Sequence, residues 1–382
     1  MHKVTPSSIE SLLQQKNEKV LSIYLPTHHS PTPPHMQEDQ TRFKNLIRAG
    51  RDTWEKQSDK QSVEKIYQQL EDKLDSTDFW QQTSKGMAVF ATTSDIEIFH
   101  LPIECEERVF VGDQHDITPL LMLMTYNQPY YILVLAMHDT KLLRGDIYGL
   151  EPVEIDFPTS PENALNIDEM FSGSQTVRAH QGGGAASPHG QGDSQEAGRE
   201  ERLQYFRIIE HMIADSDQVD NTLPIIVAGT DSESGDYKQM SKLPTLLHAY
   251  VQGNHTHTSL QELHTMTWPL IRRETVEAKI ATLVHAFEEK RASDKSSDDI
   301  PMIQTAAKAG RVETLLLRLI RTTADSVSDT NQDDIPIISF PDDYDDHTVE
   351  LVHDVCSQGG EIVGLTQEAM PNASIAAALL RY

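Results

Sequence analysis

The residues with the clearest chemical potential lie in a glycine-rich stretch, Ser172–Arg199. Glycine adopts backbone conformations that are closed to residues with a side chain, and it permits close approach to another surface. The candidate contact residues of this stretch are Arg178, His180, Gly182, Gly183, Gly184, His189, Gly190, Gln191, Gly192 and Arg199. A segment this long and this polar cannot bury an apolar face, so we expect a long loop, which either has a function or is a disordered insertion without one.

A second group of candidate residues lies near the N-terminus. His28, His29 and His35 belong to a stretch with three prolines, which predicts irregular structure. The helical pattern of residues 37–57 follows. Its cations are Arg42, Lys44, Arg48 and Arg51, whose spacing lets them share one helix face. Such a face either provides a local positive patch or is an ordinary solvated helix surface.

Other motifs that carry chemistry are absent from the sequence. It contains no GxxxxGK[ST] phosphate loop, no GxGxxG at a strand–helix junction, and no HExxH, CxxC or GxSxG. His255, His257 and His264 lack a cysteine or carboxylate at ligand spacing, so we expect no metal and no cofactor. RNase chemistry needs clustered carboxylates, and Asp139 and Asp146 have no third partner.

The composition limits the class of protein. The 382 residues include 59 acidic and 32 basic side chains, a net charge of −27 that opposes non-specific binding to nucleic acid. Cys105 and Cys356 are too few for a disulfide framework. The longest apolar run, Tyr130–Met137, is far shorter than the roughly 20 residues that span a bilayer. No signal peptide is visible, so we expect a soluble, cytoplasmic protein.

Alternating strand and helix patterns predict an α/β protein with three domains. We place these at residues 1–124, 125–258 and 259–382, with the loop 172–199 in the middle domain. Residues 239–251 are predicted to be helical, with a break at Pro244. A long helical pattern over residues 260–293, interrupted at Pro269, is expected to bridge two domains.

Several segments together resemble the bacterial relatives of archaeal and eukaryotic class 1 release factors and Pelota. SIYLPT, TRFKNLIR, VFVGD and YYILVLAMHDTKLLRGDIYGLEPVEI carry the resemblance in the first half of the chain. LQYFRIIE resembles the helix that follows the Gly-Gly-Gln loop of the release factors. AAKAGRVETLLL and the terminal IAAALLRY resemble the beginning and end of their C-terminal domain. The similarity therefore covers all three predicted domains.

The resemblance implies a three-domain architecture: an N-terminal α/β decoding-site domain, an RNase H-like middle domain and an L7Ae-like C-terminal domain. It further implies a factor that occupies the ribosomal A site. The glycine-rich loop would contact rRNA near the peptidyl transferase centre, and the cations and histidines of residues 28–51 would contact the decoding centre. The implied partners are the 70S ribosome and elongation factor Tu, which accompanies hibernation factors of this group. We expect a monomer off the ribosome and no membrane partner.

Two signatures of the release factors are missing. The sequence contains no Gly-Gly-Gln triplet; the nearest match is His189-Gly190-Gln191-Gly192, fifteen positions before Phe206 when counted from Gln191. It also contains no Asn-Ile-Lys-Ser motif. We therefore expect a non-enzymatic role in hibernation, the protection of idle or stalled ribosomes. The alternative is codon-independent hydrolysis of peptidyl-tRNA during ribosome rescue, with Gln191 positioning the attacking water.

Overall fold

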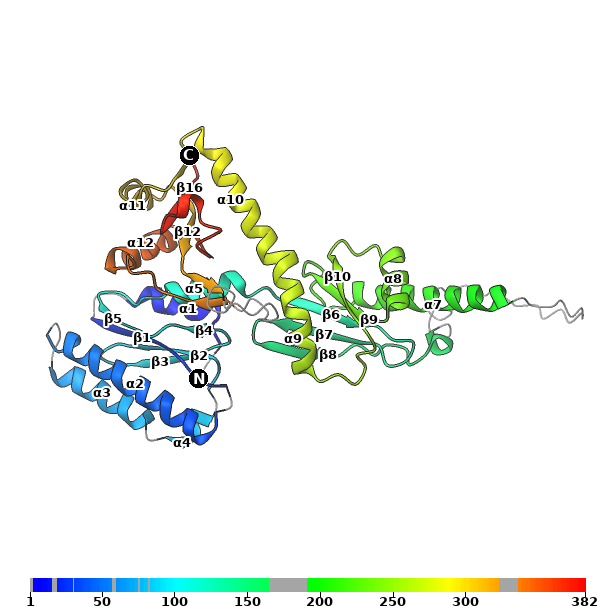
Figure 1. Cartoon of the computed structure of the whole chain (residues 1–382), viewed down its shortest axis with the longest axis horizontal. Coiled ribbons are helices and arrows are strands. Elements are labelled where there is room, and N and C mark those ends of the chain that lie inside the picture. Colours follow the sequence, from blue (N-terminus) through cyan, green and yellow to red (C-terminus); the bar gives the residue numbers. More distant parts are fainter. Residues whose placement is uncertain are drawn as a thin grey trace, which may run out of the picture. The chain divides into compact units, whose positions relative to one another are not determined.

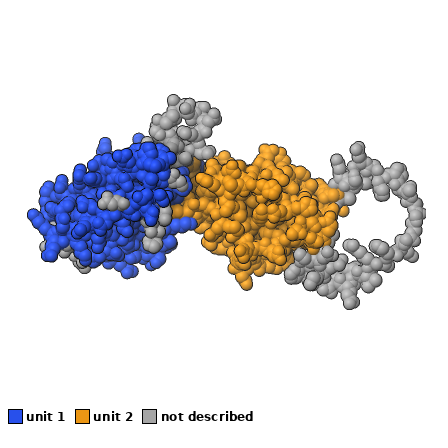
Figure 2. Space-filling model, turned by 90° about the horizontal axis from the view of Figure 1, so that it is seen from below, with its two compact units in different colours: residues 1–127, 276–382 blue, residues 128–275 orange. Residues whose placement is uncertain are grey.

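The computed structural model describes residues 3–15, 19–29, 31–56, 60–74, 76–81, 83–164, 191–322 and 336–382. The chain forms two compact units, which Figure 2 shows in different colours. Unit 1 combines residues 1–127 with residues 276–382, and unit 2 comprises residues 128–275. Helices and strands alternate in both units, so the predicted α/β class is confirmed. The division into three domains after residues 124 and 258 stays a prediction.

The N-terminal part of unit 1 is built on an antiparallel sheet with the strand order β3-β2-β1-β5. Its strands are β1 (Val20–Pro26), β2 (Gly86–Ala91), β3 (Ile96–Leu101) and β5 (Arg108–Gly112). The associated helices are α1 (Pro6–Gln14), α2 (Pro33–Trp54), α3 (Lys60–Leu74) and α4 (Thr77–Gln81). Alternate β1 residues, Leu21, Ile23 and Leu25, join the apolar core formed with α2 and α3. The period of two along the strand thus directs one face toward these helices.

The C-terminal part of unit 1 contains a sheet with the order β11-β16-β12-β15. These strands are β11 (Ser296–Ser297), β12 (Val312–Arg318), β15 (Glu361–Leu365) and β16 (Ala376–Leu380). The helices are α10 (Ala278–Arg291), α11 (Ile300–Lys308), α12 (Asp346–Ser357) and the 3₁₀ turn η3 (Pro371–Ala373). β12 is parallel to β15 and antiparallel to β16. The segment AAKAGRVETLLL forms the end of α11, a turn at Gly310 and most of β12.

A small third sheet joins the two parts of unit 1 (Figure 1). It consists of β13 (Ile320–Thr322), β14 (Pro336–Ile338) and β4 (Glu104–Cys105), and β4 pairs in parallel with β14. The neighbouring helix α5 (Thr118–Tyr126) is apolar along most of its length and has six buried residues. Segments that are far apart in sequence therefore share one hydrogen-bonded sheet.

Unit 2 is built on a five-stranded mixed sheet with the order β10-β9-β6-β7-β8. Its strands are β6 (Tyr130–Val134), β7 (Lys141–Asp146), β8 (Gly149–Val153), β9 (Ile225–Gly229) and β10 (Leu246–Gln252). The first three form an antiparallel meander, and β9 and β10 run parallel to β6. This order is that of an RNase H-like sheet, as the resemblance implied. Helices α7 (Gln191–Ala214) and α8 (Asp231–Met240) contribute to one core cluster, and α9 (Leu260–Ile271) contributes to the other.

Three local predictions are wrong, for identifiable reasons. Pro33 and Pro34 begin α2, where a missing N–H costs nothing, so the irregular stretch ends before His35. The loop ends earlier than expected because the helix-forming residues after Gln191 belong to α7. Residues 246–252 are strand β10 rather than helix, since pairing with β9 outweighs local propensity.

The long helical pattern over residues 260–293 is confirmed, with a local change of geometry. Pro269 lies inside α9, and the π-helical segment η1 (Arg272–Glu277) follows before α10 begins. A proline removes a backbone donor from the helical ladder, which is a common cause of such irregularity. Among the described helices, none is long and apolar enough to cross a membrane.

Candidate functional site

The predicted N-terminal site is organised by Asp39, a buried carboxylate that the sequence pattern did not single out. Asp39 lies on α2 and is fully buried. Its Oδ2 accepts a hydrogen bond from the backbone N–H of His28 at 2.9 Å. Its Oδ1 lies 2.9 Å from Nδ1 of His28 and accepts a bond from Nη1 of Arg42 at 3.3 Å. The spacing of Asp39 and Arg42, one helical turn apart, was the only signal for this cluster.

The structure brings two of the three predicted histidines together. The rings of His28 and His35 stack with centroids 4.2 Å apart and an interplanar angle of 6°. The carbonyl oxygen of His28 also accepts a 2.8 Å hydrogen bond from the Thr83 hydroxyl. His29 is exposed. His28, after β1, and His35, in the first turn of α2, thus form a fixed imidazole pair that Asp39 anchors through His28.

The predicted cationic face of α2 divides into two kinds of residue. Nε of Arg42 donates to Glu107 at 2.8 Å, and its Nη2 donates to Glu38 at 2.9 Å. Arg51 donates to Glu55 and to Glu64. These carboxylates neutralise both guanidinium groups, so neither is available to a phosphate in this arrangement.

Lys44 and Arg48 are the remaining members of this face. Both are exposed, and they lie four residues apart, so their side chains are neighbours on the helix surface. Neither forms an ion pair with the part of the chain that the structure describes. They are the two predicted cations of α2 whose charge remains available to an external polyanion.

A polar pocket of about 500 Å³ lies beside Arg42. Gln37, Thr41 and Asn45 from α2 supply amide and hydroxyl groups to its lining. The carboxylates of Glu38 and Glu107 also line it, and both are bonded to Arg42. The pocket suits a neutral hydrogen-bonding group better than a phosphate, because the carboxylates repel additional negative charge.

Most of the predicted loop residues lie outside the described part of the chain: Arg178, His180, Gly182, Gly183, Gly184, His189 and Gly190. Gln191 and Gly192 are the first two residues of α7. Arg199 is also on α7, where its Nε donates to Oδ1 of Asp236 at 2.9 Å. Its Nη2 donates to Oε1 of Gln239 at 3.0 Å. Arg199 is therefore directed toward α8.

Asp236 receives a second arginine from α7. Nε of Arg202 donates to Oδ2 at 2.9 Å, and Nη2 of Arg202 donates to the same oxygen. Burial alone raises the pKa of Asp236, but the hydrogen bonds from Arg202 and Arg199 reverse this effect and hold the pKa below its usual value. The carboxylate is thus charged at neutral pH, and the three-residue cluster persists there. No sequence motif predicted Asp236.

The structure gives no support to RNase chemistry in unit 2. β6, the central strand, consists of apolar and tyrosine residues without a carboxylate. Asp139 forms an ion pair with Lys141 at 2.9 Å, and Oδ1 of Asp146 accepts the N–H of Tyr148 at 2.7 Å. Across the described ranges, no group of three histidine, cysteine or acidic side chains is placed to hold a metal ion.

The histidines of residues 255–264 serve local structure. Nε2 of His255 lies 3.1 Å from the carbonyl oxygen of Gln252. Nε2 of His264 lies 2.8 Å from the carbonyl oxygen of Asp146, and its ring stacks on Trp268. These contacts place the rings at the ends of strands and against a helix.

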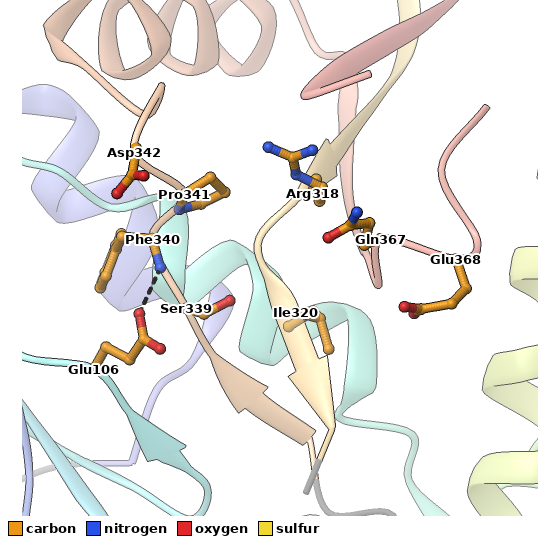
Figure 3. Close-up of a pocket in the computed structure, with 9 residues that line it drawn as sticks. All are labelled: Glu106, Arg318, Ile320, Ser339, Phe340, Pro341, Asp342, Gln367 and Glu368. Atoms are coloured by element: carbon orange, nitrogen blue, oxygen red, sulfur yellow. Dashed lines mark hydrogen bonds between the residues drawn. The ribbon is translucent and has the colours of Figure 1, made fainter. Parts of the chain in front are cut away.

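A larger pocket, of about 630 Å³, lies in unit 1 (Figure 3). Glu106 borders it and accepts the backbone N–H of Phe340 at 3.1 Å. Arg318 donates to Asp343 at 3.2 Å. The carboxylates of Asp342 and Glu368 also line the pocket, so acidic groups outnumber the single guanidinium. This balance excludes a phosphate-binding role.

Comparison with known proteins gives one family match. Residues 129–311 match the model of the bacterial archaeo-eukaryotic release factor family 3. This range includes the whole RNase H-like sheet, α7 and the Asp236 cluster, which consists of Asp236, Arg199 and Arg202. No curated protein matches the chain.

Solved structures of translation factors are also similar to this chain. An archaeal translation termination factor, aRF1, is 13% identical, with 98% of this chain and 96% of that chain covered and a TM-score of 0.24. Pelota of Archaeoglobus fulgidus is 13% identical, with 78% and 79% covered and a TM-score of 0.32. Dom34 of S. cerevisiae, described as a translation termination-like factor, is 12% identical, with 72% and 74% covered and a TM-score of 0.37.

The residues that match the family model include the strands of the RNase H-like sheet and the helix α7. The sequence signatures on both sides of that segment point to the same group. Over residues 129–311, this chain is therefore similar to the bacterial archaeo-eukaryotic release factor family 3.

Proposed function

We propose that this protein is a ribosome-associated translation factor that occupies the A site and protects idle or stalled ribosomes during hibernation. The observation that carries the proposal is the family match over residues 129–311. The chain lacks the Gly-Gly-Gln triplet, the signature of peptide release in this group, which supports a role without hydrolysis. The net charge of −27 requires that contact with rRNA be made by local patches.

We assign this contact to two segments. Lys44 and Arg48 on α2 would bind RNA phosphates at the decoding centre. The glycine-rich segment that leads into α7 would approach the peptidyl transferase centre. Elongation factor Tu would deliver the protein, which would be monomeric off the ribosome. These assignments form one proposal with a common consequence: binding must depend on salt.

Binding of the purified protein to vacant 70S ribosomes tests the proposal. The double variant Lys44→Glu/Arg48→Glu should weaken binding at least about tenfold and flatten the salt dependence, since each lost phosphate contact removes released counterions. The matched control is Lys242→Glu/Lys295→Glu, which makes the same charge change at two other exposed lysines. Equal losses in both double variants would show that α2 has no specific role, and absence of binding by the native chain would refute the proposal.

A further inference from the structure

The Asp236 cluster lies where α7 leaves the core of unit 2. The side chains of Tyr205, Phe206 and Ile209 are buried, whereas Gly198–Glu201 are exposed. Figure 1 shows the N-terminal half of α7 extending beyond the sheet. Arg199 and Arg202 are therefore the polar contacts that hold this helix at its exit point.

The partner of these arginines is itself firmly held. Asp236 lies in the middle of α8, which begins at a capping box formed by Thr230 and Glu233. The next residue, Tyr237, is fully buried and packs edge-on against Phe206 of α7. A carboxylate on such a helix, bonded by two guanidinium groups, restricts direction as well as distance because guanidinium donors are planar and rigid.

We propose that Asp236 is a positioning residue that fixes the direction in which α7 leaves unit 2. Gln191, the first residue of α7, lies eight residues before Arg199 and about 12 Å from it at 1.5 Å per residue, so a change of angle of about 10–15° at the cluster moves it by about 2–3 Å. The inference rests on the proposed function, because α7 directly follows the segment assigned to the peptidyl transferase centre. Asp236 acts through Arg199 and Arg202 and contacts no RNA itself.

A different role for Asp236 predicts the opposite effect. If Asp236 only masked two arginines from RNA, removal of its charge would free them and tighten binding to ribosomes. If Asp236 positions α7, removal of its charge loosens the base of the helix and weakens binding. The side chain of Arg199 is half exposed despite its two partners, so it could contact RNA if Asp236 released it. The two roles must therefore be distinguished by experiment.

The test compares Asp236→Asn with Asp139→Asn in the full chain. Asp139 is a suitable control because it also carries one negative charge in unit 2 and pairs with one exposed lysine, Lys141. Its φ of 66° is tolerated by asparagine, so the control introduces no strain. Hydrogen–deuterium exchange of peptides covering residues 198–206 is measured without ribosomes, and 70S affinity is measured separately.

In Asp236→Asn, exchange over residues 198–206 should be about tenfold faster or more, the change expected when a charge-assisted hydrogen bond is lost. The β6 and β9 peptides should be unchanged, and 70S binding should weaken more than in the control. Arg202→Gln should reproduce both effects. Unchanged exchange at α7, or tighter 70S binding, would overturn the positioning role. If the native chain does not bind ribosomes, the proposed function fails, and the exchange measurement still decides whether Asp236 fixes α7.

Discussion

The Tyr344 hydroxyl donates a 2.7 Å hydrogen bond to Oδ1 of Asp116, which lies 228 positions earlier in the sequence. Oδ2 of the same carboxylate accepts a bond from Nε of Arg108 at 3.0 Å. The guanidinium group of Arg108 lies 4.5 Å from the ring centroid of Tyr344. Asp116 is fully buried; Arg108 balances its charge, and the Tyr344 hydroxyl adds a hydrogen bond. The N-terminal and C-terminal segments of unit 1 are thereby fastened to each other.

Removal of this hydroxyl should destabilise unit 1. Tyr344→Phe leaves Oδ1 of Asp116 with only the longer hydrogen bond from the backbone N–H of Thr118, at 3.3 Å, which should lower the free energy of unfolding by about 1–3 kcal/mol. Urea denaturation followed by fluorescence measures the change. Tyr382→Phe serves as the control, since the Tyr382 side chain is largely exposed. Equal stability of the two variants would contradict a structural role for the Tyr344–Asp116 bond.

Stability should also fall in mild acid because of His115. Burial, with a smaller effect from His353, lowers the pKa of His115 from 6.5 to about 3. The unfolded state binds a proton near pH 6.5 that the folded state does not bind until about pH 3. The contribution is therefore fully present above pH 6.5 and is lost as the pH falls through this window, at up to about 1.4 kcal/mol per pH unit.

Urea denaturation at pH 7, 6 and 5 measures this dependence. His115 lies next to Ser22 and Gln15, so glutamine can retain some of its hydrogen bonding without titrating. His115→Gln should be less stable than the native chain at pH 7 and should show a shallower loss below pH 6.5. If the free energies of unfolding of the two proteins fall equally as the pH falls, His115 does not contribute to the pH dependence of stability.

The buried carboxylate of Asp39 should determine the conformation of the His28 segment. Asp39→Asn weakens the bonds to His28 and Arg42, and should therefore accelerate amide exchange at residues 27–29 by about tenfold. Asp52→Asn, an exposed change on the same helix, should leave this exchange unaltered. Equal exchange in both variants would show that Asp39 does not hold the His28 segment in place.

The choice between hibernation and rescue can be tested at Gln191. A hibernation factor should release no peptide from 70S complexes that carry peptidyl-tRNA, and Gln191→Ala should behave like the native protein. Peptide release is measured with a termination factor as the positive control. Release by the native chain that is lost in Gln191→Ala would favour the rescue alternative.

Local patterns predicted most of the elements that build the fold. The apolar run that forms β6 and the helix–glycine–strand order of α11 and β12 were clear from the sequence, because burial and glycine placement are local signals. The strand character of residues 246–252 was missed, since it depends on pairing with β9. Backbone pairing between distant segments leaves little trace in a short window of sequence.

The sequence predicted which cations belong to the candidate site, but not the carboxylates that they bind. The sequence singled out Arg42, Arg51 and Arg199 as cations, and the structure shows each of them bonded to a carboxylate. Glu107 and Asp236 come from elements distant in sequence, so helical spacing could not reveal these pairs. Spacing along α2 did identify Lys44 and Arg48, whose exposure depends only on the helix period.

Association with ribosomes in cells is the most direct test of the central claim. Lysates from growing cells and from cold-stressed or starved cells are separated on sucrose gradients, and the tagged native protein is followed by immunoblotting. We predict enrichment in the 70S fractions after stress, with loss of this enrichment in Lys44→Glu/Arg48→Glu. Absence of the native protein from ribosomal fractions under every condition would contradict the proposed function and leave only the fold and the family similarity of residues 129–311.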